Sequence, residues 1–171
     1  MNGCWVFVCG ASGAGKDSVI ALARTALAAR CDIVFARRII TRAAEPGSDH
    51  EPATAAEFRA LRCGGGLAWH WQAHGFDYGV PLRYAHQVAW GRIVVVNGSR
   101  EHAGQLALHP LVHCVLVSAP PDLLAARLER SERLAPVAAD LSIRNDGPLA
   151  TAGQALRRHL EALAGPVEPC R

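Results

Sequence analysis

A glycine-rich stretch near the start of the chain constrains its fold more than any other feature. Gly10–Lys16 lies between a continuous apolar run, Cys4–Cys9, and a segment with apolar residues at helical spacing. A short, continuous apolar run is typical of a buried parallel strand. Glycines allow the backbone amides to wrap closely around a phosphate, and the N-terminus of the following helix adds its positive end. This strand–loop–helix order predicts a phosphate-binding loop.

Lys16 is the only lysine among the 18 basic residues of the chain. A slim ammonium group can enter a loop of amides and reach the β- and γ-phosphates of a nucleotide, whereas the planar arginine fork is a poor substitute. The residue after this lysine is usually Ser or Thr, whose hydroxyl binds magnesium, but here Asp17 precedes Ser18. Both are predicted to hold a hard cation. The predicted nucleotide-binding residues are Gly10, Ala11, Ser12, Gly13, Ala14, Gly15, Lys16, Asp17 and Ser18. A glycine-rich turn without a ligand is the alternative interpretation.

Beyond this loop, predicted strands and helices alternate along the chain. Such alternation favours a doubly wound α/β fold, with a parallel sheet flanked by helices. The predicted strands are Ile33–Ala36, Arg92–Val96, His113–Val117 and the edge strand Leu141–Arg144. The predicted helices are Ser18–Arg30, Arg100–Leu108, Pro121–Arg133 and Leu149–Leu163.

Residues 37–90 are more polar than the rest and contain most of the aromatic residues. We interpret them as a small substrate-binding lobe inserted into a single domain of residues 1–171, whose core is 1–36 and 91–171. In this lobe, Thr54–Glu57 forms a capping box that predicts a helix, which Gly64–Gly66 would end. The alternating stretch Leu67–His74 predicts a strand with Leu67, Trp69 and Trp71 on one face. All four tryptophans are expected to lie in the core.

Composition excludes several classes of function. The formal net charge of +3 is too weak and dispersed for a nucleic-acid-binding surface. The apolar runs are too short to span a membrane and the N-terminus has no basic start, so a cytoplasmic protein is expected. The six cysteines include no C-x-x-C pair, which argues against zinc and against a disulfide framework. Buried, reduced thiols are expected instead.

The order of the motifs resembles the guanylate-kinase-like group, and more closely the ribose 1,5-bisphosphate phosphokinases of phosphonate degradation. The resemblance extends from Trp5 to about Leu163. It implies a phosphate-loop NTPase fold, ATP and Mg²⁺ as cofactors, and conversion of ribose 1,5-bisphosphate, a phosphorylated sugar, to 5-phosphoribosyl 1-diphosphate. Whether the chain is a monomer or a homodimer stays open. The matching stretches are Gly10–Ser18, Arg38–Arg42, Ser48–His50, Trp71–Gly75, Tyr78–Pro81 and Val96–Arg100.

The resemblance also assigns substrate-binding residues. Arg38, Arg42 and Tyr78 are expected to bind the phosphates of the acceptor, and Arg38 and Arg42, four residues apart along a strand, would share one face. Gln72 and Asn97 stand at the positions where guanylate kinases read guanine with carboxylates. An amide both donates and accepts hydrogen bonds, which suits a sugar hydroxyl. These two amides, with Arg100, are expected to face the sugar or its other phosphate.

The resemblance implies an arginine-rich lid, and the sequence predicts that this lid is shortened here, because Leu128–Arg133 runs almost at once into Pro136. Arg127, Arg130 and Arg133 are the remaining lid arginines, and Arg130 and Arg133 are expected to be catalytic together with Lys16. The alternative is that these arginines are solvated helix residues. Two other functions also stay open: a guanylate or other nucleoside monophosphate kinase, and a catalytically silent guanylate-kinase-like binding module.

Overall fold

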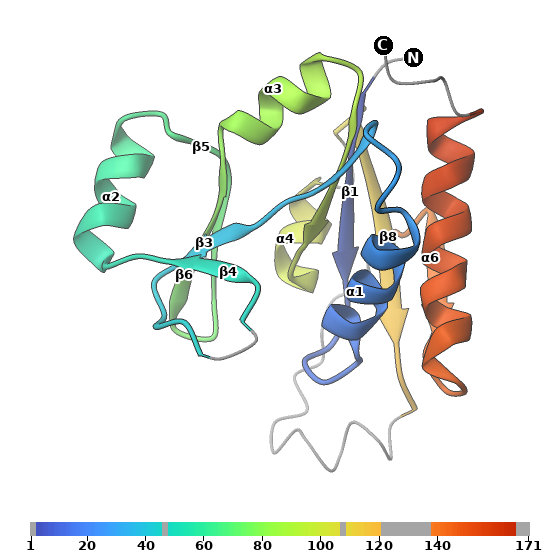
Figure 1. Cartoon of the computed structure of the whole chain (residues 1–171). Helices are drawn as coiled ribbons and strands as arrows, with labels where there is room; N and C mark the ends of the chain where they lie inside the picture. The colour runs from blue at the N-terminus through green and yellow to red at the C-terminus, as the bar shows by residue number, and fades with distance from the viewer. Residues whose placement is uncertain (1–2, 46–47, 107–108, 121–137, 167–171) are drawn as a thin grey trace.

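A five-stranded parallel sheet forms the centre of the molecule. The computed structural model describes residues 3–45, 48–106, 109–120 and 138–166 (Figure 1). The strand order is β2-β7-β1-β8-β9, and every neighbouring pair is parallel. The prediction of an α/β fold with a parallel sheet is confirmed, including an edge strand at Leu141–Arg144. The strands are β1 (Cys4–Cys9), β2 (Ile33–Phe35), β7 (Ile93–Asn97), β8 (Val112–Ser118) and β9 (Leu141–Arg144).

Strand β1 is buried along its whole length, which explains its continuous apolar sequence. Alternate residues point to opposite faces of the sheet. Val6 and Val8 pack with α1 (Lys16–Ala26) and α6 (Leu149–Ala164), which lie side by side on one face (Figure 1). Phe7 belongs to a second core cluster on the other face, shared with α4 (Arg100–Leu106), α3 (Arg83–Ala89) and the inserted lobe.

The helix boundaries differ from the predicted ones. Helix α1 begins at Lys16 rather than Ser18, because Gly15 is its N-cap, and it ends at Ala26 rather than Arg30. Arg30 instead forms two hydrogen bonds with Asp32, of 2.8 and 2.6 Å, which hold the turn before β2. Helix α6 is one residue longer than predicted. The predicted helix over residues 121–133 lies outside the described residues, as does the end of the helix predicted to reach Leu108.

Residues 38–81 form a separate four-stranded sheet with the order β4-β3-β6-β5. The predicted capping box is present: the Glu57 amide donates to the Thr54 hydroxyl (3.2 Å) and the Thr54 amide donates to the Glu57 carboxylate (2.7 Å). Helix α3, which leads from this sheet to β7, was not predicted. The elements are β3 (Arg38–Ile40), β4 (His50–Pro52), α2 (Ala55–Cys63), β5 (Leu67–Ala73) and β6 (Phe76–Pro81).

A bulge at Ala68 shifts the register of β5. Leu67 pairs with Pro81, but Trp69 pairs with Val80. An extra residue in one strand moves everything before it to the opposite face. Leu67 therefore faces away from Trp69 and lies beside Gly79, where an added Cβ atom would be 2.9 Å from the Leu67 side chain. The prediction that Leu67 shares the face of Trp69 is wrong.

Two further expectations are wrong: that all four tryptophans lie in the core, and that the cysteines are buried and reduced. Trp90 is 70% exposed at the end of α3, whereas Trp5 and Trp71 are buried. Cys63 is an exposed thiol, and Cys31 is disulfide-bonded rather than reduced. Within the described residues, no helix is long and apolar enough to cross a membrane.

Candidate active site

The Gly10–Lys16 loop lies at the carboxyl edge of the central sheet, directly after β1. A Cβ atom at Gly10 would lie 2.1 Å from the carbonyl oxygen of Val117, so the loop needs glycine there. Gly15 has a φ of 85°, in the left-handed region, and a Cβ atom at Gly15 would lie 2.4 Å from the Asn145 amide. These restraints fix the path of the loop into the first turn of α1.

Lys16 folds back over the loop that precedes it. Its ammonium donates to the carbonyl oxygens of Gly10 and Ala11, both at 3.0 Å. Burial lowers the pKa of Lys16, and the charge of Asp17 opposes this shift. An ammonium that donates to neutral carbonyls and is partly removed from water favours an anionic partner.

Asp17 and Asn97 join the loop to the next strand of the sheet. The Asn97 amide, at the carboxyl end of β7, donates to the Asp17 carboxylate at 2.6 Å. Because parallel strands β1 and β7 end at the same edge, these residues meet although they are 80 positions apart. Asp17 and Ser18 are both exposed in the first turn of α1, so their oxygen atoms are accessible to a cation.

Asn145 is a further loop residue that the sequence did not single out. Its amide donates to the carbonyl oxygen of Ala14 at 3.0 Å. Asn145 follows β9, whose carboxyl end lies at the same edge as the loop. A polar residue directly after a predicted parallel strand was the available signal.

Arg38 lies at the start of β3, on the lobe. Its guanidinium carbon is 5.5 Å from the centre of the buried Tyr78 ring, a cation–π arrangement. Burial lowers the pKa of Arg38, while the charges of Asp17, Tyr78 and Asp49 oppose this shift and that of Arg42 adds to it. Arg38 in turn lowers the pKa of Lys16, so the structure brings the lobe arginine and the loop lysine into one electrostatic environment.

Arg42 lies in the bend after β3, because that strand ends at Ile40. The expectation that one strand carries both arginines is therefore wrong. Both arginines instead lie against aromatic rings of β6. The guanidinium carbon of Arg42 is 5.9 Å from the centre of the Phe76 ring, and Phe76 lies two residues before Tyr78, on the same face of the strand. Buried His50 fixes this bend through a 3.2 Å hydrogen bond from Nε2 to the Arg42 carbonyl oxygen.

Gln72 is not brought to these residues. It pairs with Asp77 across the β5–β6 hairpin, and its exposed amide donates to the Asp77 carboxylate at 2.8 Å. The next pair, Trp71 and Tyr78, faces the opposite side. Gln72 thus lies on the other face of the hairpin from Tyr78.

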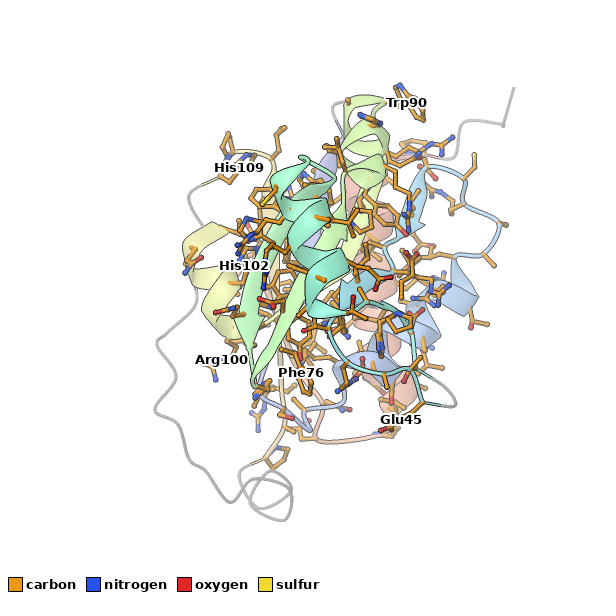
Figure 2. All side chains as sticks on the ribbon, turned by 90° about the vertical axis from the view of Figure 1, so that its left-hand side faces the viewer. Glu45, Phe76, Trp90, Arg100, His102 and His109 are labelled. Carbon is orange, nitrogen blue, oxygen red and sulfur yellow. The ribbon has the colours of Figure 1, made fainter. Side chains whose placement is uncertain are left out.

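Arg100, in contrast, is the first residue of α4 and lies close to the loop. Burial raises the pKa of Cys9 to about 11, and the charges of both Lys16 and Arg100 oppose the shift. Figure 2 shows Arg100 toward the same end of the hairpin as Phe76. The predicted lid residues Arg127, Arg130 and Arg133 lie outside the described residues.

Three aromatic rings continue inward from Arg38. The Tyr78 ring stacks on Trp71 at 5.5 Å between centroids, and Trp71 stacks on His102 at 4.6 Å. His102 belongs to α4 on the central domain, so this stack joins the lobe to the core. Sequence reasoning missed His102, because a single histidine in a short helix gives no signal.

The chain is similar to known proteins in sequence and in structure. No protein-family model matches the chain. It is 41% identical to the ribose 1,5-bisphosphate phosphokinase PhnN of Acidiphilium cryptum, over 90% of both chains. It is 38% identical to that of Methylobacterium radiotolerans, over 95% of this chain and 99% of the other.

The fold is shared with a solved guanylate kinase from Anaplasma phagocytophilum. The TM-score is 0.70, with 20% sequence identity over 94% of this chain and 85% of the other. This similarity establishes the fold, and the sequence identities above establish the family. The chain belongs to the ribose 1,5-bisphosphate phosphokinase family.

Proposed function

We propose that the chain catalyses ATP-dependent phosphorylation of ribose 1,5-bisphosphate, giving 5-phosphoribosyl 1-diphosphate and ADP. The observation that supports this proposal is that two cationic groups from different parts of the chain share one electrostatic environment. Lys16 lies in the loop of the core and Arg38 lies in the lobe; burial lowers the pKa of both groups, and the charge of Asp17 opposes this shift in both. One group suits the phosphates of the donor, and the other suits a phosphate of the acceptor.

The chemistry needs little beyond this placement. A phosphate monoester has a second pKa of about 6, so the acceptor is already a dianion at neutral pH and needs no general base. An oxygen of its 1-phosphate attacks the γ-phosphorus of ATP, a new P–O–P bond forms, and the bond to the bridging oxygen of ADP breaks. Catalysis then depends on alignment and on neutralising charge. Lys16 would act on the donor, and Arg38 and Arg42 would hold the acceptor.

Asp17 and Ser18 fit a magnesium ion. Their exposed oxygen atoms are of the hard type that Mg²⁺ prefers, and Mg²⁺ usually takes one or two protein ligands with phosphates and water. The hydrogen bond from Asn97 orients the Asp17 carboxylate for this role. The bound ion would neutralise charge on the donor phosphates.

The loop amides and the N-terminus of α1 would bind the phosphates of ATP. The glycines support this assignment, because a side chain at Gly10 or Gly15 would collide with neighbouring residues and displace the loop backbone whose amides would bind the phosphates. Tyr78 would hold Arg38 in place rather than contact the acceptor itself, since its ring is buried beneath the guanidinium.

The test is ADP release by the full chain with ATP and MgCl₂, offered ribose 1,5-bisphosphate or GMP. Release that depends on the sugar and is lost in Lys16→Ala supports the proposal. Release with GMP alone would indicate a nucleoside monophosphate kinase, and release with neither would indicate a binding module. A cytoplasmic location and the lack of a nucleic-acid partner stay predictions of the sequence, and the choice between monomer and homodimer stays open.

A further inference from the structure

Nitrogen atoms without hydrogen-bond partners gather where the lobe meets α4. Among the described residues, seven side-chain nitrogen atoms are buried and lack a partner, and five of them belong to this one region. They are Trp69 Nε1, Trp71 Nε1, Arg100 Nε, and both Nδ1 and Nε2 of His102. Buried polar atoms in native proteins nearly always have a partner, so such a concentration calls for an explanation.

The rings that carry these atoms are in direct contact. His102 is 5% exposed and lies 4.6 Å from the Trp71 ring and 6.1 Å from the Trp69 ring. Figure 2 shows His102 on the α4 side of the hairpin, between Arg100 and His109. Packing alone does not account for the imidazole of His102, because a phenylalanine ring would fill the same position against Trp71 without an unsatisfied polar atom.

The chemical character of the region defines what it can bind. Burial lowers the pKa of His102 to about 4, and the nearby His70 contributes to this shift. The imidazole is therefore neutral at physiological pH and offers one donor and one acceptor. Together with two indole N–H donors, this set suits neutral groups that both donate and accept. Hydroxyl groups have that character, whereas a phosphate only accepts.

We propose that His102, with the indole N–H groups of Trp69 and Trp71, forms the subsite that binds the ribose hydroxyls of the acceptor. This inference rests on the proposed function and specifies its substrate recognition. The position is consistent with that role, because Trp71 stacks on Tyr78, and the guanidinium of Arg38 lies over the Tyr78 ring. A sugar in this subsite has its phosphate within reach of the arginine.

The subsite lies between two parts of the chain. Trp69 and Trp71 come from the lobe, and His102 and Arg100 come from the core. Because neighbouring side chains cover the nitrogens, the lobe must move away from α4 for a sugar to reach them. Ring contacts across this boundary can separate without breaking a strand pairing, since the lobe has its own sheet.

The experiment compares ribose 1,5-bisphosphate with its 2-deoxy and 3-deoxy analogues in the wild type and in His102→Phe. The substitution keeps a flat ring in the stack and removes both nitrogens. We expect the wild type to prefer the ribose compound to at least one analogue by about tenfold or more in kcat/KM. In His102→Phe this preference should fall to within about twofold, with an unchanged KM for ATP. The control is His109→Phe, which alters an exposed histidine that also lies against Trp69.

A wild type that does not discriminate among the sugars, or a His102→Phe variant that keeps the full preference, would overturn the subsite. Trp71→Phe provides an independent check if His102→Phe does not fold, because it removes one donor and keeps the stack. Its control is Trp90→Phe at the exposed tryptophan, and an unchanged preference in Trp71→Phe would also overturn the proposal. If the wild type does not phosphorylate ribose 1,5-bisphosphate at all, the proposed function itself fails, and the subsite fails with it.

Discussion

The proposed donor side and the proposed acceptor side of this site are built in opposite ways. The phosphate loop is a contiguous stretch at one strand–helix junction, and its shape follows from glycines and a single lysine. The acceptor side is assembled from a strand, a bend, a hairpin and a helix, which contribute Arg38, Arg42, Tyr78 and His102. A contiguous site depends on local backbone geometry, whereas an assembled site depends on strand register and on packing between the lobe and the core.

This difference predicts different responses to substitution. On the proposed donor side one side chain carries the positive charge, so its loss should be severe. On the proposed acceptor side two arginines and a neutral subsite would share the binding of the substrate, so single losses should be graded. The following predictions test that contrast.

Lys16→Ala should lower kcat by about 10²–10³-fold, because it removes the ammonium that we propose contacts the transferred phosphoryl group. The free energy of unfolding should stay close to the wild-type value, since within the described residues the Lys16 ammonium donates to loop carbonyls and not to the core. Steady-state kinetics and chemical denaturation measure the two quantities. Near-normal turnover of Lys16→Ala would contradict the proposed role of the phosphate loop in catalysis.

Arg38→Ala should raise the KM for the acceptor by about tenfold to 10²-fold, and Arg42→Ala by less, while the KM for ATP changes little. The half-buried Arg38 is shielded from water, whereas Arg42 is exposed and its charge is screened. Kinetics at varied acceptor and fixed, saturating ATP measure the effect. Equal losses in both variants, or a raised KM for ATP, would contradict this division of roles.

His102→Phe should flatten the acid side of the stability profile. In the folded protein the pKa of His102 is about 4, below its usual 6.5, so the unfolded chain binds the extra proton between these values. The wild type should lose stability from this group as pH falls from 6.5 to 4, by up to about 1.4 kcal/mol per pH unit. Denaturation at several pH values, compared with His109→Phe, measures the difference. Parallel profiles would mean that His102 is not buried in its neutral form.

Gln72→Ala should have the smallest effect, less than about twofold in kcat/KM, a change typical of an exposed surface residue. Its amide binds Asp77 on the face of the hairpin opposite Tyr78. Asn97→Ala is the informative comparison, because Asn97 contacts Asp17 at the donor site and should raise the Mg²⁺ concentration that the enzyme needs. If Gln72→Ala impairs sugar use more than Asn97→Ala does, the placement of the hairpin is wrong.

The sequence predicted the core well because its signals there are local. The apolar run of β1, the glycines of the loop and the capping box at Thr54 each act within a few residues. The parallel sheet and its edge strand followed from the alternation of these elements. The fold is accordingly confirmed, and the helix ends differ by only a few residues.

The acceptor side was harder to predict because its geometry depends on pairing between distant segments. A one-residue bulge at Ala68 reversed the face of Leu67, and the early end of β3 moved Arg42 off its strand. The position of Gln72 relative to Tyr78 depends on the hairpin register, and the stack on His102 depends on how the lobe packs against α4. None of these relations is present in residue spacing alone.

The most direct test of the central claim, that the loop passes a phosphoryl group to a phosphate held by the lobe, is ³¹P NMR of the full reaction. The full chain is mixed with ATP, MgCl₂ and ribose 1,5-bisphosphate, and the phosphorus signals are followed over time. We predict a new diphosphate on carbon 1 of the sugar that grows in step with ADP, with the 5-phosphate signal unchanged in amount. Release of inorganic phosphate alone, or an unchanged sugar spectrum, would contradict the account.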